Sequence, residues 1–170
     1  TNGSDALKCS ARLIRSVRPS KRYMVSSNRR FVSGCLIGLA IALLVVGVVS
    51  GTFLRHVVQI VPIIVAIGVL TRRPDWGAYA AVPIFIFWIF IVVLIWLFLL
   101  GLSPIANGHY TVIEILLTLF MAGFPVAGVA QSIPLGEALR PIGRVLAVML
   151  FGVLQVAAMW VSFLKPIANR

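Results

Sequence analysis

The chain is built from long apolar runs separated by short polar breaks. A helix needs about 20 apolar residues to cross the hydrocarbon core of a bilayer, and five runs of that order follow a polar first segment. The pattern therefore predicts an all-α, polytopic integral membrane protein whose transmembrane domain is a five-helix bundle. We expect the spans at about 31–50, 53–71, 77–101, 112–130 and 144–164.

The breaks between the runs contain residues that end helices. Pro74 cannot continue the backbone hydrogen bonds of the second span, and Arg72 and Arg73 suit the negative end of its helix dipole. The Asn-Gly pair at 107–108 is a turn signal, and two prolines interrupt 131–144. These breaks predict short loops between consecutive spans.

The distribution of positive charge predicts the orientation in the membrane, because Lys and Arg in short loops mark the cytoplasmic side. Residues 1–30 hold eight of the 15 Lys and Arg residues. We therefore expect a basic cytoplasmic arm over 1–30, a transmembrane domain over 31–164 and a short exoplasmic tail over 165–170. Four further charges are expected at the cytoplasmic face, against anionic lipid head groups or a partner: Arg72, Arg73, Arg140 and Arg144.

Composition agrees with a membrane protein. Hydrophobic residues make up 61% of the chain and charged residues 11%, with a mean hydropathy of +1.07, against about 45–50% and about 25% in soluble domains. Residues 1–30 contribute +7 of the net charge of +11. The basicity is thus a flanking signal, and it leaves no folded basic surface for nucleic acid.

The basic arm bears on the choice of membrane. Residues 6–23 are rich in Arg, contain Ser and lack acidic side chains, a pattern that resembles a mitochondrial presequence and equally suits a cytoplasmic basic arm. The simplest expectation is a bacterial cytoplasmic membrane, and the mitochondrial inner membrane is the alternative.

Catalytic chemistry has little support in the residue pattern. Only Asp75, Glu114 and Glu137 are acidic beyond residue 30, and the expected topology puts Glu114 on the opposite side from the other two, which disfavours a general acid and base pair. Cys9 and Cys35 have no metal-ligand or disulfide spacing. We expect a non-catalytic protein without a metal or cofactor.

Glu114 lies at the start of an apolar run, where a carboxylate calls for an explanation. "TVIE" at 111–114 fits the capping-box pattern, in which Thr111 and Glu114 satisfy free N–H groups at the helix start. At 1.5 Å per residue, Glu114 would lie only about 5 Å into the helix. The structural interpretation, a helix cap in the hydrated interface, is therefore favoured over a functional one.

The functional alternative joins two spans. Arg55, His56 and Gln59 begin the second span at the same expected level as His109 and Glu114. If spans two and four touch, these residues would form an outward-facing polar cluster that relays protons or binds a small polar solute. Separate interfacial residues are the simpler interpretation.

Small residues recur at helical spacing in two spans. Such spacing lets helix backbones approach closely in a membrane, and the partner could be this chain, a second copy or another protein. We therefore expect an accessory or assembly subunit of a membrane complex, or a homo-oligomer; a small-solute or ion transporter or channel is the alternative. The expected packing positions are Gly34, Gly38, Ala42, Gly47, Gly51, Gly123 and Ala127.

Overall fold

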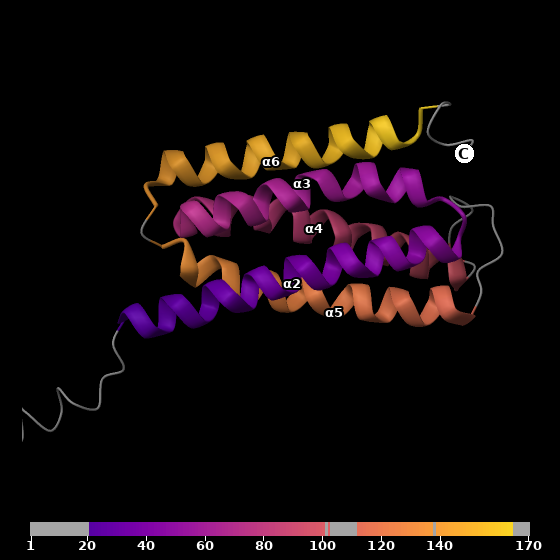
Figure 1. Cartoon of the computed structure of the whole chain (residues 1–170), viewed down its shortest axis with the longest axis horizontal. Helices are drawn as coiled ribbons and strands as arrows, with labels where there is room; N and C mark the ends of the chain where they lie inside the picture. Colours follow the sequence, from indigo (N-terminus) through magenta and orange to yellow (C-terminus); the bar gives the residue numbers. More distant parts are fainter. Residues whose placement is uncertain (1–20, 101, 103–111, 138, 165–170) are drawn as a thin grey trace, which may run out of the picture.

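The computed structural model describes residues 21–100, 102, 112–137 and 139–164, and the regular structure of these residues is helical (Figure 1). Each helix contains a stretch long and apolar enough to cross a membrane. For the described part of the chain, the prediction of an all-α structure with five such helices is confirmed. The helices are α2 (Lys21–Val49), α3 (Phe53–Arg72), α4 (Pro74–Leu99), α5 (Val112–Leu135) and α6 (Pro141–Ser162).

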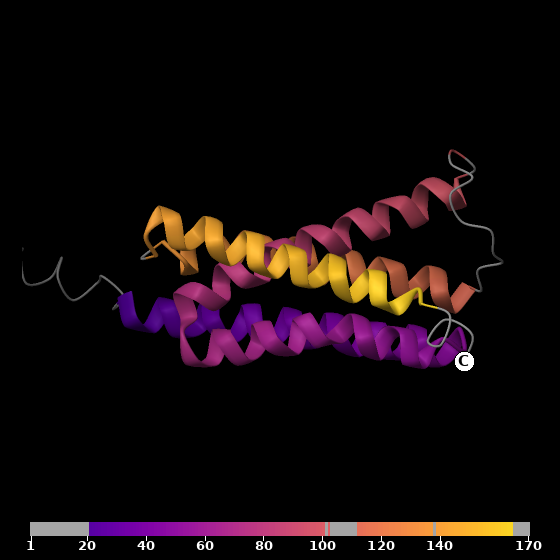
Figure 2. The ribbon, with the colours of Figure 1, turned by 90° about the horizontal axis from the view of Figure 1, so that it is seen from above.

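The helices run up and down in chain order, and α4 is the element that the others share (Figures 1 and 2). It packs closely against α3, α5 and α6 and touches α2 at the margin. Helix α2 also packs against α3 and α5, and α6 packs against α3. Within the described residues, α5 contacts neither α3 nor α6.

Two helices extend beyond the apolar runs that predicted them. Helix α2 begins at Lys21, inside the expected basic arm, and α5 continues to Leu135. Residues 131–133 contain no helix breaker, so α5 continues through them. Pro134 lies in the last turn of α5, and its missing N–H therefore costs only one hydrogen bond near the helix end. The chain then turns at Gly136, whose N–H bonds back to Ser132 O at 3.2 Å.

The connections between the first three helices are tight. Gly51 joins α2 to α3 with φ of 68°, a backbone conformation that glycine adopts without the clash of a Cβ. Ser50 Oγ donates to Val46 O at 2.8 Å and lies 2.6 Å from Thr52 Oγ1. Pro74 is the first residue of α4, where its missing N–H removes no helix hydrogen bond.

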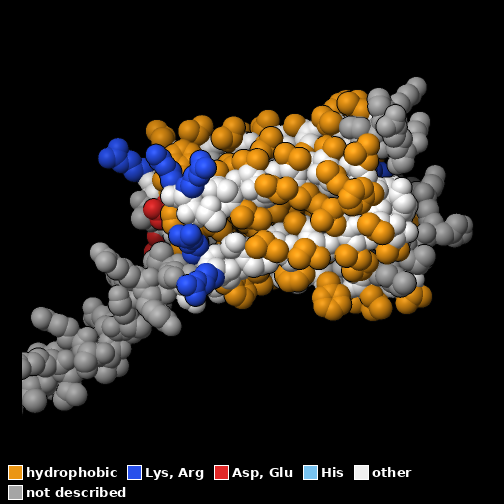
Figure 3. Space-filling model, in the orientation of Figure 1, with side chains coloured by type: hydrophobic (Ala, Val, Ile, Leu, Met, Phe, Trp, Pro, Cys, Tyr) orange, Lys and Arg blue, Asp and Glu red, His pale blue; other side chains and the backbone are white. Residues whose placement is uncertain are grey.

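On the face shown in Figure 3, the middle of the bundle is covered mostly by hydrophobic side chains, and most of the described charged side chains lie at one end. Lys and Arg side chains gather where α2 and α6 begin and α3 ends, which we call the basic end. The opposite end, where the 50–52 turn joins α2 to α3, is called the distal end. Large side chains such as Ile64, Phe90 and Trp160 are more than half exposed on the flanks, as expected of helices that face lipid.

Candidate functional site

A cavity of about 480 Å³ lies between the helices toward the distal end, and we call it the distal cavity. Its polar lining comes mainly from α3 and the turn before it, and α4 contributes more of its apolar lining than any other helix. The polar residues are Ser50, Thr52, Arg55, His56, Gln59 and Thr118. The apolar residues are Leu43, Val46, Trp88, Ile91, Leu94, Ile95, Met121, Met159 and Phe163.

Gln59 joins two walls of the distal cavity. Its side chain is only 3% exposed, and its Nε2 donates to Ser162 Oγ at 3.0 Å and approaches Met159 Sδ at 3.2 Å. Ser162 Oγ in turn donates to Met159 O at 2.7 Å. The amide therefore links α3 to α6, and this pairing offsets the cost of burying it.

His56 is held by the turn that precedes α3. Its Nδ1 lies 3.0 Å from Thr52 O and 3.1 Å from Thr52 Oγ1. The carbonyl contact assigns a proton to Nδ1, which leaves Nε2 of the neutral ring as an acceptor. On the other side, a Cβ on Gly47 would meet the His56 ring, so glycine lets α2 approach α3 here.

Arg55 provides positive charge at the cavity. Its Cζ lies 3.8 Å from the centroid of the Phe163 ring, a cation–π contact between α3 and the end of α6. Stacking uses the face of the guanidinium and leaves the N–H groups at its edge available to a ligand. None of the described lining residues is acidic.

Trp88 brings a polar atom to the α4 wall. The side chain is 3% exposed, and its Nε1 has no hydrogen-bond partner among the described residues. A buried N–H without an acceptor costs about 1–3 kcal/mol. This donor is enclosed in the packed wall beside the distal cavity, where the fold tolerates it unpaired.

The structure brings together only part of the polar cluster expected from the sequence. Arg55, His56 and Gln59 line one cavity, whereas His109 and Thr111 lie outside the described residues. Glu114 is the third residue of α5, but its side chain is also outside the described part. In that part α3 and α5 do not pack against each other; they face each other across the distal cavity instead.

Sequence patterns did not single out the other side of this cavity. Thr118 and Met121 of α5 and Trp88 of α4 line it, yet each stands in an apolar run that reads equally as lipid-facing. Their only sequence signal is that Thr118 and Met121 are three residues apart, on one helix face.

The four expected inner-face charges lie at the basic end. Arg72, Arg73 and Arg140 are exposed. Arg144 is tied to the preceding loop, because its Nε donates to Leu139 O at 2.8 Å and its Nη2 to Glu137 O at 2.6 Å. Three of the four guanidinium groups are therefore open to solvent or lipid head groups.

The small residues proposed for packing face different neighbours. A Cβ on Gly38 would meet the Phe124 ring of α5, whereas Gly47 faces α3. Gly34 and Gly123 have open space around them, and Gly51 lies in the turn. Ala42 is buried, and Ala127 packs at the edge of the core.

The closest helix approaches occur at glycines outside that expected set. A Cβ on Gly77 would overlap the backbone of Leu70, and one on Gly128 would overlap the Phe85 ring. The first contact lies between α3 and α4, and the second between α4 and α5. At each contact a single glycine, without a Cβ, allows the two helices to approach closely. Gly77 and Ala81, and Gly128 and Ser132, are each four residues apart, so the spacing was present in the sequence but was not among the expected packing positions.

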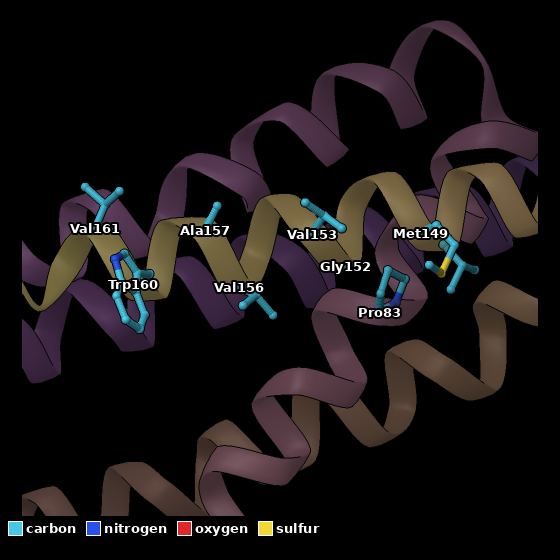
Figure 4. Close-up of a pocket in the computed structure, with 9 residues that line it drawn as sticks. Pro83, Met149, Gly152, Val153, Val156, Ala157, Trp160 and Val161 are labelled. Carbon is cyan, nitrogen blue, oxygen red and sulfur yellow. The ribbon is translucent and has the colours of Figure 1, made fainter.

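A second hollow, of about 700 Å³, is a groove along α6 beside Pro83 of α4 (Figure 4). Val156 and Trp160 lie along it, and Met149 lies near Pro83. Its lining residues are apolar or glycine, and the indole N–H of Trp160 is their one side-chain polar group, so the groove offers little to orient a solute.

Fold and surface place the chain in the class of helical membrane proteins, with five helices of membrane-crossing length. Within the described residues, no group of His, Cys, Asp and Glu side chains could hold a metal ion. Comparisons with family models, curated proteins and solved structures give no match.

Proposed function

We propose that this chain is a non-catalytic integral membrane protein that binds a small solute in the distal cavity, as a transporter or channel component. The observation that carries the proposal is the gathering of Arg55, His56 and Gln59 on one wall of that cavity. Polar groups beside apolar walls are typical of small-molecule sites, and the volume of about 480 Å³ is within their usual range.

The positive-inside rule assigns a side to the cavity. We place the basic end in the cytoplasm, so the distal cavity faces the exoplasmic space. A bacterial cytoplasmic membrane remains the simplest location, and the mitochondrial inner membrane is the alternative. On either assignment, a solute would enter from the side opposite the basic arm.

Water access to the cavity tests the proposal. Leu94 lines the distal cavity, whereas its neighbour Val93 is 48% exposed on the flank. In a background carrying Cys9→Ser and Cys35→Ala, we expect Leu94→Cys to react with a water-soluble sulfonatoethyl methanethiosulfonate in proteoliposomes. Val93→Cys should react at least about tenfold more slowly, because lipid excludes the charged reagent and suppresses the thiolate.

The relative reactivity of the two cysteines decides whether water enters the distal cavity. Faster reaction at Leu94→Cys than at the more exposed Val93→Cys requires a water-filled cavity inside the bundle. An inert Leu94→Cys, in a protein that still extracts as a folded bundle, would rule out solute entry and leave the second candidate function.

The second candidate is an accessory or assembly subunit, or a homo-oligomer. It is favoured by α6, which in the described part contacts only α3 and α4 and leaves an apolar face beside the groove. Trp160 on that face is 76% exposed. Lipid chains can also cover such a face, so exposure alone does not select a protein partner.

Mass measurement distinguishes these cases. We expect an accessory subunit extracted in mild detergent to retain a second copy or another membrane protein in fixed stoichiometry. Trp160→Ala should weaken that association, whereas Phe90→Ala, a change at an exposed residue of α4, should not. A particle of one chain with lipid and detergent alone would argue against this function.

A further inference from the structure

We propose that the distal cavity binds an elongated amphiphilic anion, with its acidic group at Arg55 and its apolar body along α4. The inference rests on the proposed function and narrows it to a ligand class. Carboxylate and phosphate heads share the required chemistry, because both accept the edge N–H groups of a guanidinium.

The charge of the lining selects an anion. Arg55 is half-buried and stacked on Phe163, so its guanidinium is positioned without a described carboxylate partner. No acidic side chain stands among the described lining residues. A cationic ligand would meet repulsion here, and a neutral ligand would leave the guanidinium unpaired.

The α4 wall accounts for the apolar body. Trp88, Ile91 and Ile95 line the cavity at spacings of three and four residues, which places them on one helix face. Between residues 88 and 95 the helix rises about 10 Å. Met121 of α5 adds to this apolar surface. A ligand that covers it is therefore longer than a simple ion.

Trp88 marks the inner end of the α4 wall. Its unpaired Nε1 belongs to the deepest of the α4 residues along the cavity, counted from the distal end of that helix. The indole N–H is a reporter, since its NMR signal responds to what occupies the cavity.

The experiment compares an acid with its neutral isostere. The ¹⁵N-labelled chain in phosphatidylcholine nanodiscs is titrated at neutral pH with 4-phenylbutyrate and with 4-phenyl-1-butanol. We expect the acid to shift the Trp88 indole signal saturably, with an affinity at least about tenfold higher than that of the alcohol. The Trp76 signal, at the basic end, should move only slightly and serves as the internal control.

Variants connect the preference to Arg55. Arg55→Gln should lower the affinity for the acid about tenfold, to that of the alcohol, and leave the alcohol unchanged. Arg55→Lys keeps the charge but not the planar fork, so it should be intermediate. Arg73→Gln, at the basic end, is the matched control and should behave like the parent. An otherwise unchanged spectrum shows that each variant is folded.

A lipid arm identifies the source of the anion. With phosphatidylglycerol in the nanodiscs, a lipid ligand would shift the Trp88 signal before any acid is added and would compete with it. A soluble acid as the natural ligand would leave that starting signal unchanged. Together with saturable, Arg55-dependent binding of the acid, either result supports an anionic site.

Two results would overturn the inference without touching the proposed function. The first is that the acid and the alcohol bind with equal affinity. The second is that Arg55→Gln leaves the affinity for the acid unchanged. If neither probe moves the Trp88 signal, the anion assignment also falls. The reactivity of Leu94→Cys then decides separately whether the cavity admits solutes.

Discussion

At the residue scale, glycine sets how closely helices approach α4. Gly77 faces the backbone of Leu70, and Gly136 faces the Tyr79 ring. A ring can rotate away from a new Cβ, but a helix backbone cannot move without carrying its neighbours. Gly77 is therefore the position at which the smallest substitution should cost most.

We expect Gly77→Ala to lower the free energy of unfolding by about 1–3 kcal/mol or more, because the added methyl overpacks the α3–α4 contact. Gly34→Ala is the matched control. It adds the same methyl where nothing lies within 4 Å and should be neutral or stabilising by up to about 1 kcal/mol. Reversible unfolding in mixed micelles measures both, and equal effects would contradict the close approach.

At the residue scale, the capping role of Glu114 remains a prediction. It is the third residue of α5, the position that a capping box requires. Glu114→Gln should be nearly neutral and Glu114→Ala should cost about 0.5–2 kcal/mol, since Gln retains the acceptor and Ala does not. If Gln and Ala instead impair ligand binding equally while stability is unchanged, the charge serves the site and not the cap.

At the scale of elements, α3 and α6 each bury a glutamine, and the two differ in their hydrogen bonding. Gln59 is hydrogen-bonded across the helix pair to Ser162. Gln155 is fully buried on α6, and neither of its amide atoms has a partner among the described residues. The same chemical group therefore contributes to the fold at one position and costs free energy at the other.

The same substitution should change stability in opposite directions at these positions. Gln59→Leu should lower the free energy of unfolding by about 0.6–2 kcal/mol by removing an interhelical hydrogen bond. Gln155→Leu should raise it by about 1–3 kcal/mol, because an unsatisfied buried amide is replaced by an apolar side chain. Steric trapping or detergent unfolding reports both, and a destabilised Gln155→Leu would reveal a partner for that amide.

At the scale of the whole molecule, the two ends of the described bundle differ in positive charge. Arg29, Arg30, Arg72, Arg73, Arg140 and Arg144 belong to segments that meet at the basic end. Arg55 belongs to the distal end and is partly covered by Phe163. The positive-inside rule acts on such a difference.

Single cysteines test the orientation. Thr71 and Ser50 are exposed residues near opposite ends of the bundle. In the background without native cysteines, we expect a membrane-impermeant maleimide to label Ser50→Cys in intact cells and Thr71→Cys only after permeabilisation. The reverse pattern would invert the bundle and open the distal cavity to the cytoplasm.

The number and approximate bounds of the helices could be read from the sequence, because crossing a bilayer depends on the length and local composition of each run. Helix ends were harder to place. Helix α2 begins at Lys21 and α5 ends at Leu135, since polar residues can continue a helix beyond its apolar run. Three members of the expected polar cluster share a turn and a half of α3, so their proximity was local information.

The sequence by itself determined the helical character of the described residues, their five helices of membrane-crossing length and a strong charge asymmetry, because these properties belong to each segment separately. Only the tertiary structure decided that Arg55, His56 and Gln59 share a cavity with Trp88 and Thr118. That outcome depends on how each helix rotates and which neighbours it meets, and α4, apolar on every side, carries no sequence pattern that fixes its rotation.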